Sequence, residues 1–258
     1  MIHIGGKPCG YGHVPILTAD IAHNHNGDID LALKTIDAIA DAGFDGAKLQ
    51  YYRTEDFCQP DSKEMLEYTS QGKKVTERYY DFCKRHEISL DFVADCREYA
   101  TGLDMIFGVT TTSAQGVRDV AEYCDYFKIA SDMVSNGEML DEMEIEHPFM
   151  PRVLSAGHLD INSESGEFYK KKDTIILHCV PEYPANHAKL WKITHYRQIG
   201  LMTGYSDHTT TNEAVIRAVD LGAVFIEVHA TLDKYLPGEG HHYSKDPQQL
   251  KALVEAIK

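Results

Sequence analysis

The chain has 258 residues, of which 43% are hydrophobic, enough to bury one sizeable core within the usual size of an α/β barrel. Its formal net charge of −15 argues against nucleic acid and anionic membrane surfaces as partners, because like charges repel. The six cysteines show no metal-site spacing, and no apolar run approaches the ~18 residues of a membrane span, so we expect one reduced, cytoplasmic domain.

Short apolar or β-branched runs alternate with amphipathic stretches along the chain, a pattern typical of parallel strands joined by helices. Residues 1–13 precede this pattern and are rich in glycine, so we predict a small hairpin under the main fold. The eight predicted strands are Ile16–Ile21, Gly46–Gln50, Met105–Thr110, Tyr126–Ser131, Arg152–Ala156, Thr174–Cys179, Leu201–Ser206 and Val224–His229. The predicted fold class is therefore α/β, a (β/α)8 TIM barrel spanning residues 1–258 as one domain.

The segments between the strands agree with this interpretation. Apolar residues repeat at helical spacing over Ile29–Ala42, and Gly43 suits the end of that helix. Thr54–Lys74 reads as a long polar excursion after the second strand. Asp246–Ile257 opens with Asp-Pro, a helix-start signal, and forms the last predicted helix.

Two lysines fall at inward positions of predicted strands. Side chains of a barrel strand point alternately to the helices and into the barrel. The apolar residues around them suit the helical layer, which leaves Lys48, Gln50 and Lys128 inside. Buried charge is costly unless it is paired or bound to an ion, so these lysines indicate either an anionic ligand or structural ion pairs.

The first and last strands add acidic and imidazole groups to the same interior. The alternation places Thr18 and Asp20 inside on the first strand, and Phe225, Glu227 and His229 inside on the last. In parallel barrels, the functional site lies at the C-terminal ends of the strands.

A second histidine, His208, follows the neighbouring predicted strand at a matching position. On adjacent strands, His208 and His229 lie close enough to share a metal ion, and the alternative is two hydrogen-bonded structural histidines. Ser131, Ser155 and Ser206 occupy further strand ends and, with the two lysines, favour binding of a phosphate or carboxylate.

Six ordered motifs resemble those of the N-acetylneuraminate (sialic acid) synthase family. They are AHNHNGD at 22–28, AKLQ at 47–50, YFKIAS at 126–131, HCVPEYP at 178–184, GYSDHT at 204–209 and IEVHATLD at 226–233. The corresponding family patterns are INHNGD, VKFQ, YKIAS, HCTSxYP, GYSDHT and IEKHFTLD. The set covers nearly the whole chain and is specific as a set.

This resemblance implies an enzyme that condenses phosphoenolpyruvate with an open-chain amino sugar, such as N-acetylmannosamine or a relative, and releases phosphate. It implies a divalent ion, Mn2+ or Mg2+, on His208 and His229, and catalytic roles for Asp20, Lys48 and Lys128. The substrate-binding residues that it implies are Asn24, Asn26, Gln50, Thr110, Ser131, Ser155, Tyr183, Ser206, Asp207 and Glu239.

The chain departs from the family pattern at three motif positions. Asp20 replaces the usual Glu, and Pro181 replaces a Ser or Asn. Gly240 stands where the family carries an Asp that contacts the sugar, so Glu239 is the candidate substitute. We also expect the chain to correspond to the barrel without the family's antifreeze-like cap domain. The expected assembly is either a homodimer or a complex with a partner that supplies the cap domain.

Three alternatives stay open at this level. A Schiff-base aldolase or lyase of a keto sugar acid would use Lys48 or Lys128 as its nucleophile. A related barrel synthase would use an aldose phosphate as its acceptor. A non-catalytic barrel that binds a sugar acid and needs a partner would bind ligand without releasing phosphate.

Overall fold

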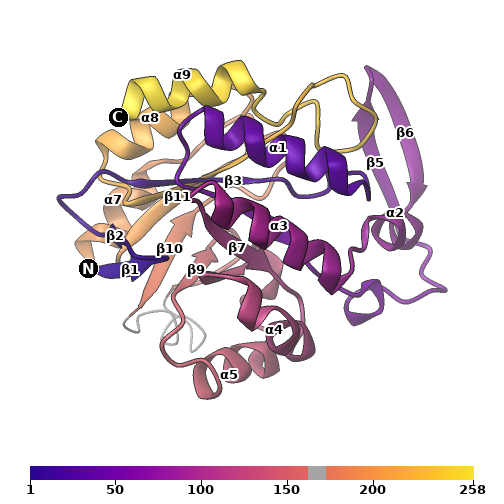
Figure 1. Cartoon of the computed structure of the whole chain (residues 1–258), viewed down its shortest axis with the longest axis horizontal. Coiled ribbons are helices and arrows are strands. Elements are labelled where there is room, and N and C mark those ends of the chain that lie inside the picture. The colour runs from indigo at the N-terminus through magenta and orange to yellow at the C-terminus, as the bar shows by residue number, and fades with distance from the viewer. Residues whose placement is uncertain (162–172) are drawn as a thin grey trace.

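The computed structural model describes residues 1–161 and 173–258. At its centre, parallel strands close into a barrel in the order β3-β4-β7-β8-β9-β10-β11-β12 (Figure 1). Their bounds are β3 Ile16–Asp20, β4 Gly46–Gln50, β7 Ile106–Thr110, β8 Tyr126–Ile129, β9 Arg152–Ser155, β10 Thr174–His178, β11 Thr203–Asp207 and β12 Phe225–His229. The predicted TIM barrel is confirmed, and neighbours in sequence are neighbours in the sheet.

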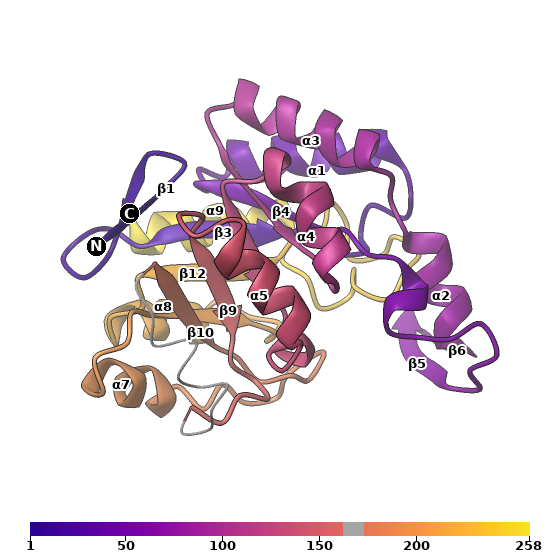
Figure 2. The ribbon, with the colours of Figure 1, turned by 90° about the horizontal axis from the view of Figure 1, so that it is seen from below.

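Helices pack around the outside of the barrel, as Figures 1 and 2 show. Those described are α1 Ile29–Asp41, α2 Tyr79–His86, α3 Leu90–Gly102, α4 Ala114–Val120, α5 Gly137–Ile145, α7 Trp191–Gln198, α8 Glu213–Asp220 and α9 Pro247–Ile257. The start of α9 explains the Asp-Pro signal, because Asp246 and Gln249 form a reciprocal capping box and Pro247 occupies the first helical position. None of the described helices combines the length and apolar character needed to cross a membrane.

The predicted strand bounds differ from the observed ones by one or two residues at several ends. Ser131 was placed in a strand but begins a short 3-10 turn, Ser131–Met133. β11 begins at Thr203 and includes Asp207, one residue beyond the predicted end. Such shifts arise because apolar pattern marks burial, whereas the end of a strand is set by where the ladder of backbone hydrogen bonds stops.

The excursion after β4 is more ordered than its polar composition indicates. It contains an antiparallel hairpin, β5 Met65–Ser70 and β6 Lys73–Arg78, which projects from one end of the barrel (Figures 1 and 2). Leu66 and Tyr68 of β5 pack against the buried Phe82 of α2. The polar side chains of the strands face water, while this small cluster anchors the hairpin to the barrel.

The N-terminal hairpin forms as predicted and lies at the end of the barrel opposite β5 and β6 (Figure 2). Its strands are β1 Ile2–Ile4 and β2 Lys7–Cys9, paired antiparallel. Ile4 is fully buried and belongs to a cluster inside the barrel that also holds Tyr126 and Phe225. This end of the barrel is thus filled with apolar side chains, so the polar residues of the interior are confined to the other end.

Replacing Phe225 with Ala tests how much the apolar cluster at this end of the barrel contributes to stability. The ring is fully buried and meets the Tyr126 ring edge-on, with the centroids 5.6 Å apart. Because the surrounding barrel cannot collapse into the cavity, we expect Phe225→Ala to lower the free energy of unfolding by about 3–5 kcal/mol, and Phe225→Leu by distinctly less. Urea unfolding of the two variants measures the loss; equal stability of Phe225→Ala and the parent would contradict this packing role.

Candidate active site

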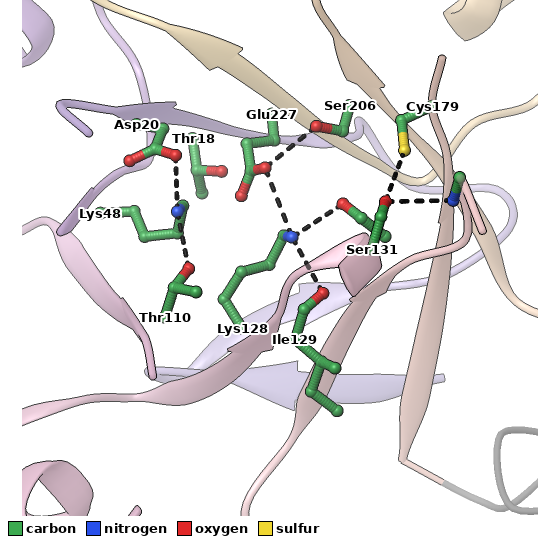
Figure 3. Close-up of polar contacts among 12 residues, drawn as sticks. Thr18, Asp20, Lys48, Thr110, Lys128, Ile129, Ser131, Cys179, Ser206 and Glu227 are labelled. Carbon is green, nitrogen blue, oxygen red and sulfur yellow. Dashed lines mark hydrogen bonds and ion pairs between the residues drawn. The ribbon is translucent and has the colours of Figure 1, made fainter. Parts of the chain in front are cut away.

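The C-terminal strand ends surround a cavity whose floor is polar, and Lys48 lies on one side of it. Its Nζ lies 2.6 Å from Oδ2 of Asp20 on the neighbouring strand and donates to Oγ1 of Thr110 at 2.8 Å (Figure 3). Asp20 also accepts from the backbone N–H of Ala22 and from Nε2 of Gln50. Burial acts to raise the pKa of Asp20, but the Lys48 ammonium and the backbone N–H of Ala22 offset it and hold the pKa well below its ordinary value.

Lys128 forms the second half of the floor. Its Nζ donates to Oγ of Ser155 at 2.7 Å and to the carbonyl of Ile129 at 3.2 Å, and lies 3.6 Å from Glu227 (Figure 3). Burial lowers the pKa of Lys128, and the Glu227 carboxylate partly counteracts that shift. Ser206 donates to Oε1 of Glu227 at 3.0 Å, whereas Oε2 is buried with no hydrogen-bond partner among the described residues.

The hydroxyl of Ser131 also belongs to the cavity lining and contacts Cys179 (Figure 3). Its Oγ accepts from the backbone N–H of Gly157 at 3.1 Å and lies 3.2 Å from Sγ of Cys179. Gly157 permits this contact, because a Cβ at that position would lie 2.7 Å from the Ser131 Oγ. The strand ends therefore bring hydroxyl groups and ammonium groups together, the combination that binds phosphate and carboxylate groups.

The two predicted metal ligands lie side by side at the edge of the same cavity. The ring centroids of His208 and His229 are 5.4 Å apart. Burial lowers the pKa of each imidazole to about 4, so both rings are neutral at pH 7. Tyr183 stacks on the His208 ring, with a centroid distance of 4.1 Å.

This pair fits the chemistry of a metal ligand set in two respects. His208 Nδ1 donates to the carbonyl of Val180 at 2.6 Å, which fixes the tautomer and leaves a lone pair on Nε2. His229 Nδ1 is buried without a hydrogen-bond partner in the described part of the chain. Among those same residues no group of three or more His, Cys, Asp and Glu side chains is arranged for a metal, so an ion here needs further ligands from substrate or water.

The cavity gathers most of the side chains that the sequence predicted as a site. The predicted residues that line it are Asp20, Lys48, Gln50, Thr110, Lys128, Ser131, Ser155, Tyr183, Ser206, His208 and His229. They come from strands far apart in the sequence, which the closed barrel brings to one end.

A family model described as the NeuB family matches residues 35–258. The chain belongs to the NeuB family. It is 27% identical to the N,N'-diacetyllegionaminic acid synthase of Legionella pneumophila over 98% of this chain and 74% of the relative. It is 29% identical to the N-acetylneuraminate-9-phosphate synthase of Mus musculus over 99% of this chain and 71% of the relative.

Solved structures agree. The N-acetylneuraminic acid (sialic acid) synthetase of Leptospira borgpetersenii, crystallised with citrate, superposes with a TM-score of 0.88 at 26% identity, over 99% of this chain and 87% of that one. The family resemblance inferred from the motifs is confirmed, and this NeuB protein is an enzyme of the sialic acid synthase type.

Four predicted substrate-binding residues of this NeuB protein do not line the cavity. Asp207 points away from it, and its Oδ2 lies 2.9 Å from Nζ of the buried Lys245. This orientation follows from alternation along β11, since Ser206 faces the cavity and the next side chain must face the helices. Asp207 also accepts from the hydroxyl of Tyr205 and so belongs to the scaffold.

Asn24 and Asn26 also lie outside the cavity lining, and both amides form hydrogen bonds within the loops around the cavity. Asn24 Nδ2 donates to the carbonyl of Ala230 and to the Ser244 hydroxyl. Asn26 Nδ2 donates to the carbonyl of Pro237 at 2.8 Å. These bonds tie the loop after β3 to the segment after β12, so the Asn-rich motif shapes the rim.

Glu239, the candidate substitute for the family Asp, also lies outside the cavity lining. Its Oε2 accepts from the hydroxyl of Tyr243 at 3.1 Å. The Tyr243 ring in turn meets the rings of Tyr183 and His229, each at a centroid distance of 5.6 Å. Glu239 therefore reaches the site only through Tyr243.

Other residues in the cavity lining were absent from the predicted site. Glu227 was expected on the inner face but was given no role, although its free Oε2 marks it as a functional candidate. The lining also includes Tyr52, Phe57, Tyr79 and Met133. No motif marks these four, and of them only Phe57 lies within the predicted polar excursion Thr54–Lys74.

Glu239 makes the stability of the protein depend on pH. Burial raises its pKa to about 7, above the ordinary value of 4.5. Between those values the folded state holds a proton that the unfolded state has released, so stability falls as pH rises from about 4.5 to 7. We expect Glu239→Gln to gain about 1–3 kcal/mol in free energy of unfolding relative to the parent between pH 5 and 8.

Urea unfolding of both proteins across that range checks the shift. Glu138→Gln serves as the matched control, because its carboxylate lies in the first turn of α5 and is exposed. A difference between Glu239→Gln and the parent that does not change with pH would contradict a raised pKa.

Proposed function

We propose that this protein condenses phosphoenolpyruvate with the open-chain form of an amino sugar, giving a nonulosonic or related 3-deoxy sugar acid and inorganic phosphate. One observation carries the proposal: two buried lysines, strand-end hydroxyls and a pair of neutral imidazoles line one cavity. The family membership and the names of the relatives support the same reaction type.

Phosphoenolpyruvate carries two anionic groups, and the cavity floor offers two cationic positions. Lys48 and Lys128 donate at present to Thr110 and Ser155, so the bound substrate would enter an existing network of donors. The charges are fixed before the substrate arrives, and this pre-organisation stabilises negative charge as phosphate departs.

The reaction joins C3 of the enolpyruvate to the aldehyde carbon of the sugar while water adds at C2, and the resulting tetrahedral centre expels phosphate. A divalent ion, Mn2+ or Mg2+, held by His208 and His229 would supply Lewis-acid polarisation of the aldehyde oxygen. We assign the proton of the attacking water to Glu227, whose Oε2 has no hydrogen-bond partner among the described residues and which lines the cavity.

Asp20 has a different role in this proposal from that of a base. Its lowered pKa and its contacts with Lys48 and Gln50 keep it ionised and engaged. A carboxylate in that state is a weak base, so we assign it to holding the Lys48 ammonium in place. In this role the shorter Asp20 can replace the family Glu, because holding Lys48 does not require it to reach the reacting atoms.

A second function is favoured by one observation. The lowered pKa of Lys128 is also what a Schiff-base nucleophile needs, because only the neutral amine attacks a carbonyl. Borohydride trapping with a keto acid separates the two functions. An aldolase gives covalent modification at Lys128, whereas the synthase gives none and releases phosphate from phosphoenolpyruvate.

The decisive experiment measures phosphate release from phosphoenolpyruvate with Mn2+ and a panel of amino sugars. Release that needs both a sugar and the metal supports the proposal, and chelator-treated protein is the control. We expect His208→Gln to lose this release together with bound Mn2+, which metal analysis measures independently. Phosphate release without a sugar would refute the condensation reaction. Unchanged metal content in the variant would refute the role of His208 as a metal ligand.

Removing the ammonium of Lys128 tests the anion site directly. We expect Lys128→Ala to weaken phosphoenolpyruvate binding by about 1.5–3 kcal/mol, as for loss of a charge-assisted hydrogen bond. Calorimetry measures the affinity. Lys245→Met is the matched control, since Lys245 is equally buried and paired with a carboxylate but lies outside the cavity lining. Equal losses of affinity in the two variants would mean that Lys128 supports the fold and does not contact the anion.

A further inference from the structure

His229 differs from His208 in how its ring is held. The Nδ1 of His208 donates to the carbonyl of Val180 at 2.6 Å, a bond that fixes both the tautomer and the orientation of the ring. The Nδ1 of His229 is buried and has no hydrogen-bond partner in the described part of the chain. No bond from that nitrogen to those residues orients the His229 imidazole, so the side chains that pack against the ring must do so.

Two tyrosine rings pack against His229. Tyr243 meets the imidazole edge-on, with a centroid distance of 5.6 Å and an interplanar angle of 80°. Tyr183 meets it at 5.7 Å and 85°. The two tyrosines also contact each other, with their centroids 5.6 Å apart, and Tyr183 stacks on His208. Because His208 and His229 are neighbours as well, the four rings form one closed cluster.

Tyr243 is the more confined of the two tyrosines. It is 4% exposed and does not line the cavity, whereas Tyr183 is 49% exposed and does. A half-exposed ring has room to change its rotamer, whereas a buried ring in a close-packed region is held by its neighbours. The orientation of the cluster therefore depends on Tyr243 more than on Tyr183.

The backbone places Tyr243 next to His229. Two residues after Tyr243, the N–H of Lys245 donates to the carbonyl of His229 at 2.7 Å. The N–H of Thr231 donates to the carbonyl of Lys245 at 3.0 Å, and Ala230 forms a parallel bridge with Lys245. The segment that carries Tyr243 is thus tied to the end of β12, the strand on which His229 lies.

The hydroxyl end of the Tyr243 side chain is held by Glu239. That hydroxyl donates to Oε2 of Glu239 at 3.1 Å. The loop that carries Glu239 is in turn joined to the hairpin of β5 and β6, because the N–H of Gly238 donates to the hydroxyl of Ser70 at 3.1 Å. The ring of Tyr243 is therefore restrained at both ends, by its own backbone and by this loop.

We infer that Tyr243 is a positioning residue: held by Glu239, its ring sets the orientation of the His229 imidazole, as the Val180 carbonyl does for His208. The inference rests on the proposed function, in which His229 is a metal ligand. A ligand that is already oriented loses less freedom when an ion binds, so metal affinity depends on such support. Tyr243 lies outside the cavity lining, so its role concerns the metal ligand and not the anion site.

The first test observes the imidazole directly and without metal. NMR spectra of proteins labelled with 13C in the histidine rings are compared, and the two signals are assigned from His208→Gln and His229→Gln. In the parent we expect one sharp His229 signal. In Tyr243→Leu we expect that signal to broaden or split, while the His208 signal stays single because its bond to Val180 is kept. Tyr243→Phe retains the ring and is expected to restore the parent spectrum.

The second test measures Mn2+ affinity by calorimetry. We expect Tyr243→Leu to weaken Mn2+ binding about tenfold or more, the effect typical of removing the support of a metal-ligating histidine. Tyr243→Phe, which loses only the hydroxyl bond, is expected to stay within about threefold of the parent. Binding of phosphoenolpyruvate to chelator-treated Tyr243→Leu is expected to stay within about twofold, because the two sites are separate.

Tyr196→Leu is the matched control. Tyr196 is 3% exposed, packs in the barrel core and does not line the cavity. Its replacement removes a buried tyrosine ring without touching the histidines, so Mn2+ affinity is expected to stay at the parent value. Tyr243→Met, whose flexible side chain adapts to the space, replaces Tyr243→Leu in both tests if that variant does not fold.

The outcomes separate this inference from the proposed function. Equal Mn2+ affinity in Tyr243→Leu and the parent, or equal weakening in Tyr196→Leu, overturns the inference and leaves the metal site standing. A matching loss of phosphoenolpyruvate binding also overturns it, because general loosening of the barrel would then explain both losses. If the parent itself binds no Mn2+, the metal assignment of the proposed function fails. NMR then decides the inference, and an unchanged His229 signal in Tyr243→Leu overturns it.

Discussion

Two buried charge pairs, Lys48 with Asp20 and Lys128 with Glu227, are the constraint on which the cavity floor depends. Charged groups inside a barrel persist only when each is paired and hydrogen-bonded, because the cost of removing them from water is large. The closed sheet provides this by setting Asp20 opposite Lys48 on paired strands and bringing Glu227 across to Lys128. The result is a set of charges that is already fixed in position, as the proposed binding of an anion requires.

The remainder of the barrel confines these charges to one end. The N-terminal hairpin and the interior cluster around Phe225 close the opposite end with apolar side chains. Outside the sheet, Asp207 pairs with Lys245 and the loop amides of Asn24 and Asn26 join the segments around the rim. Several motif residues thus serve the shape of the site from positions outside the cavity.

The segment after β4 contributes aromatic side chains to the cavity lining. Three aromatic side chains, Tyr52, Phe57 and Tyr79, line the cavity and belong to the cluster around Phe82, so the lining combines charged and aromatic groups. Under the proposed reaction, a lining with both kinds of surface would hold two unlike substrates in one orientation, which lowers the entropic barrier to joining them.

Much of this molecule was predictable from its sequence. The alternation of apolar runs determined the barrel, and period-two patterning placed Lys48, Lys128 and Asp20 inside, because each rule depends only on local geometry. Motif order led to the family and to His208 and His229. Motif order could not place the Asp207 side chain, since motif membership does not say which face of a strand a residue occupies.

Only the tertiary structure decided which groups meet. The pairing of Glu227 with Lys128 joins β12 and β8, two strands that are not neighbours in the barrel. The contact of Glu239 with Tyr243 depends on a loop conformation that no local rule specifies. The aromatic part of the cavity lining, Tyr52, Phe57 and Tyr79, is a further case, because these rings are scattered among polar residues that conceal any periodicity. Sequence alone determined the strands and the residue types on their inner faces. Long-range packing decided which side chains contact one another, because contacts across a closed sheet depend on every strand at once.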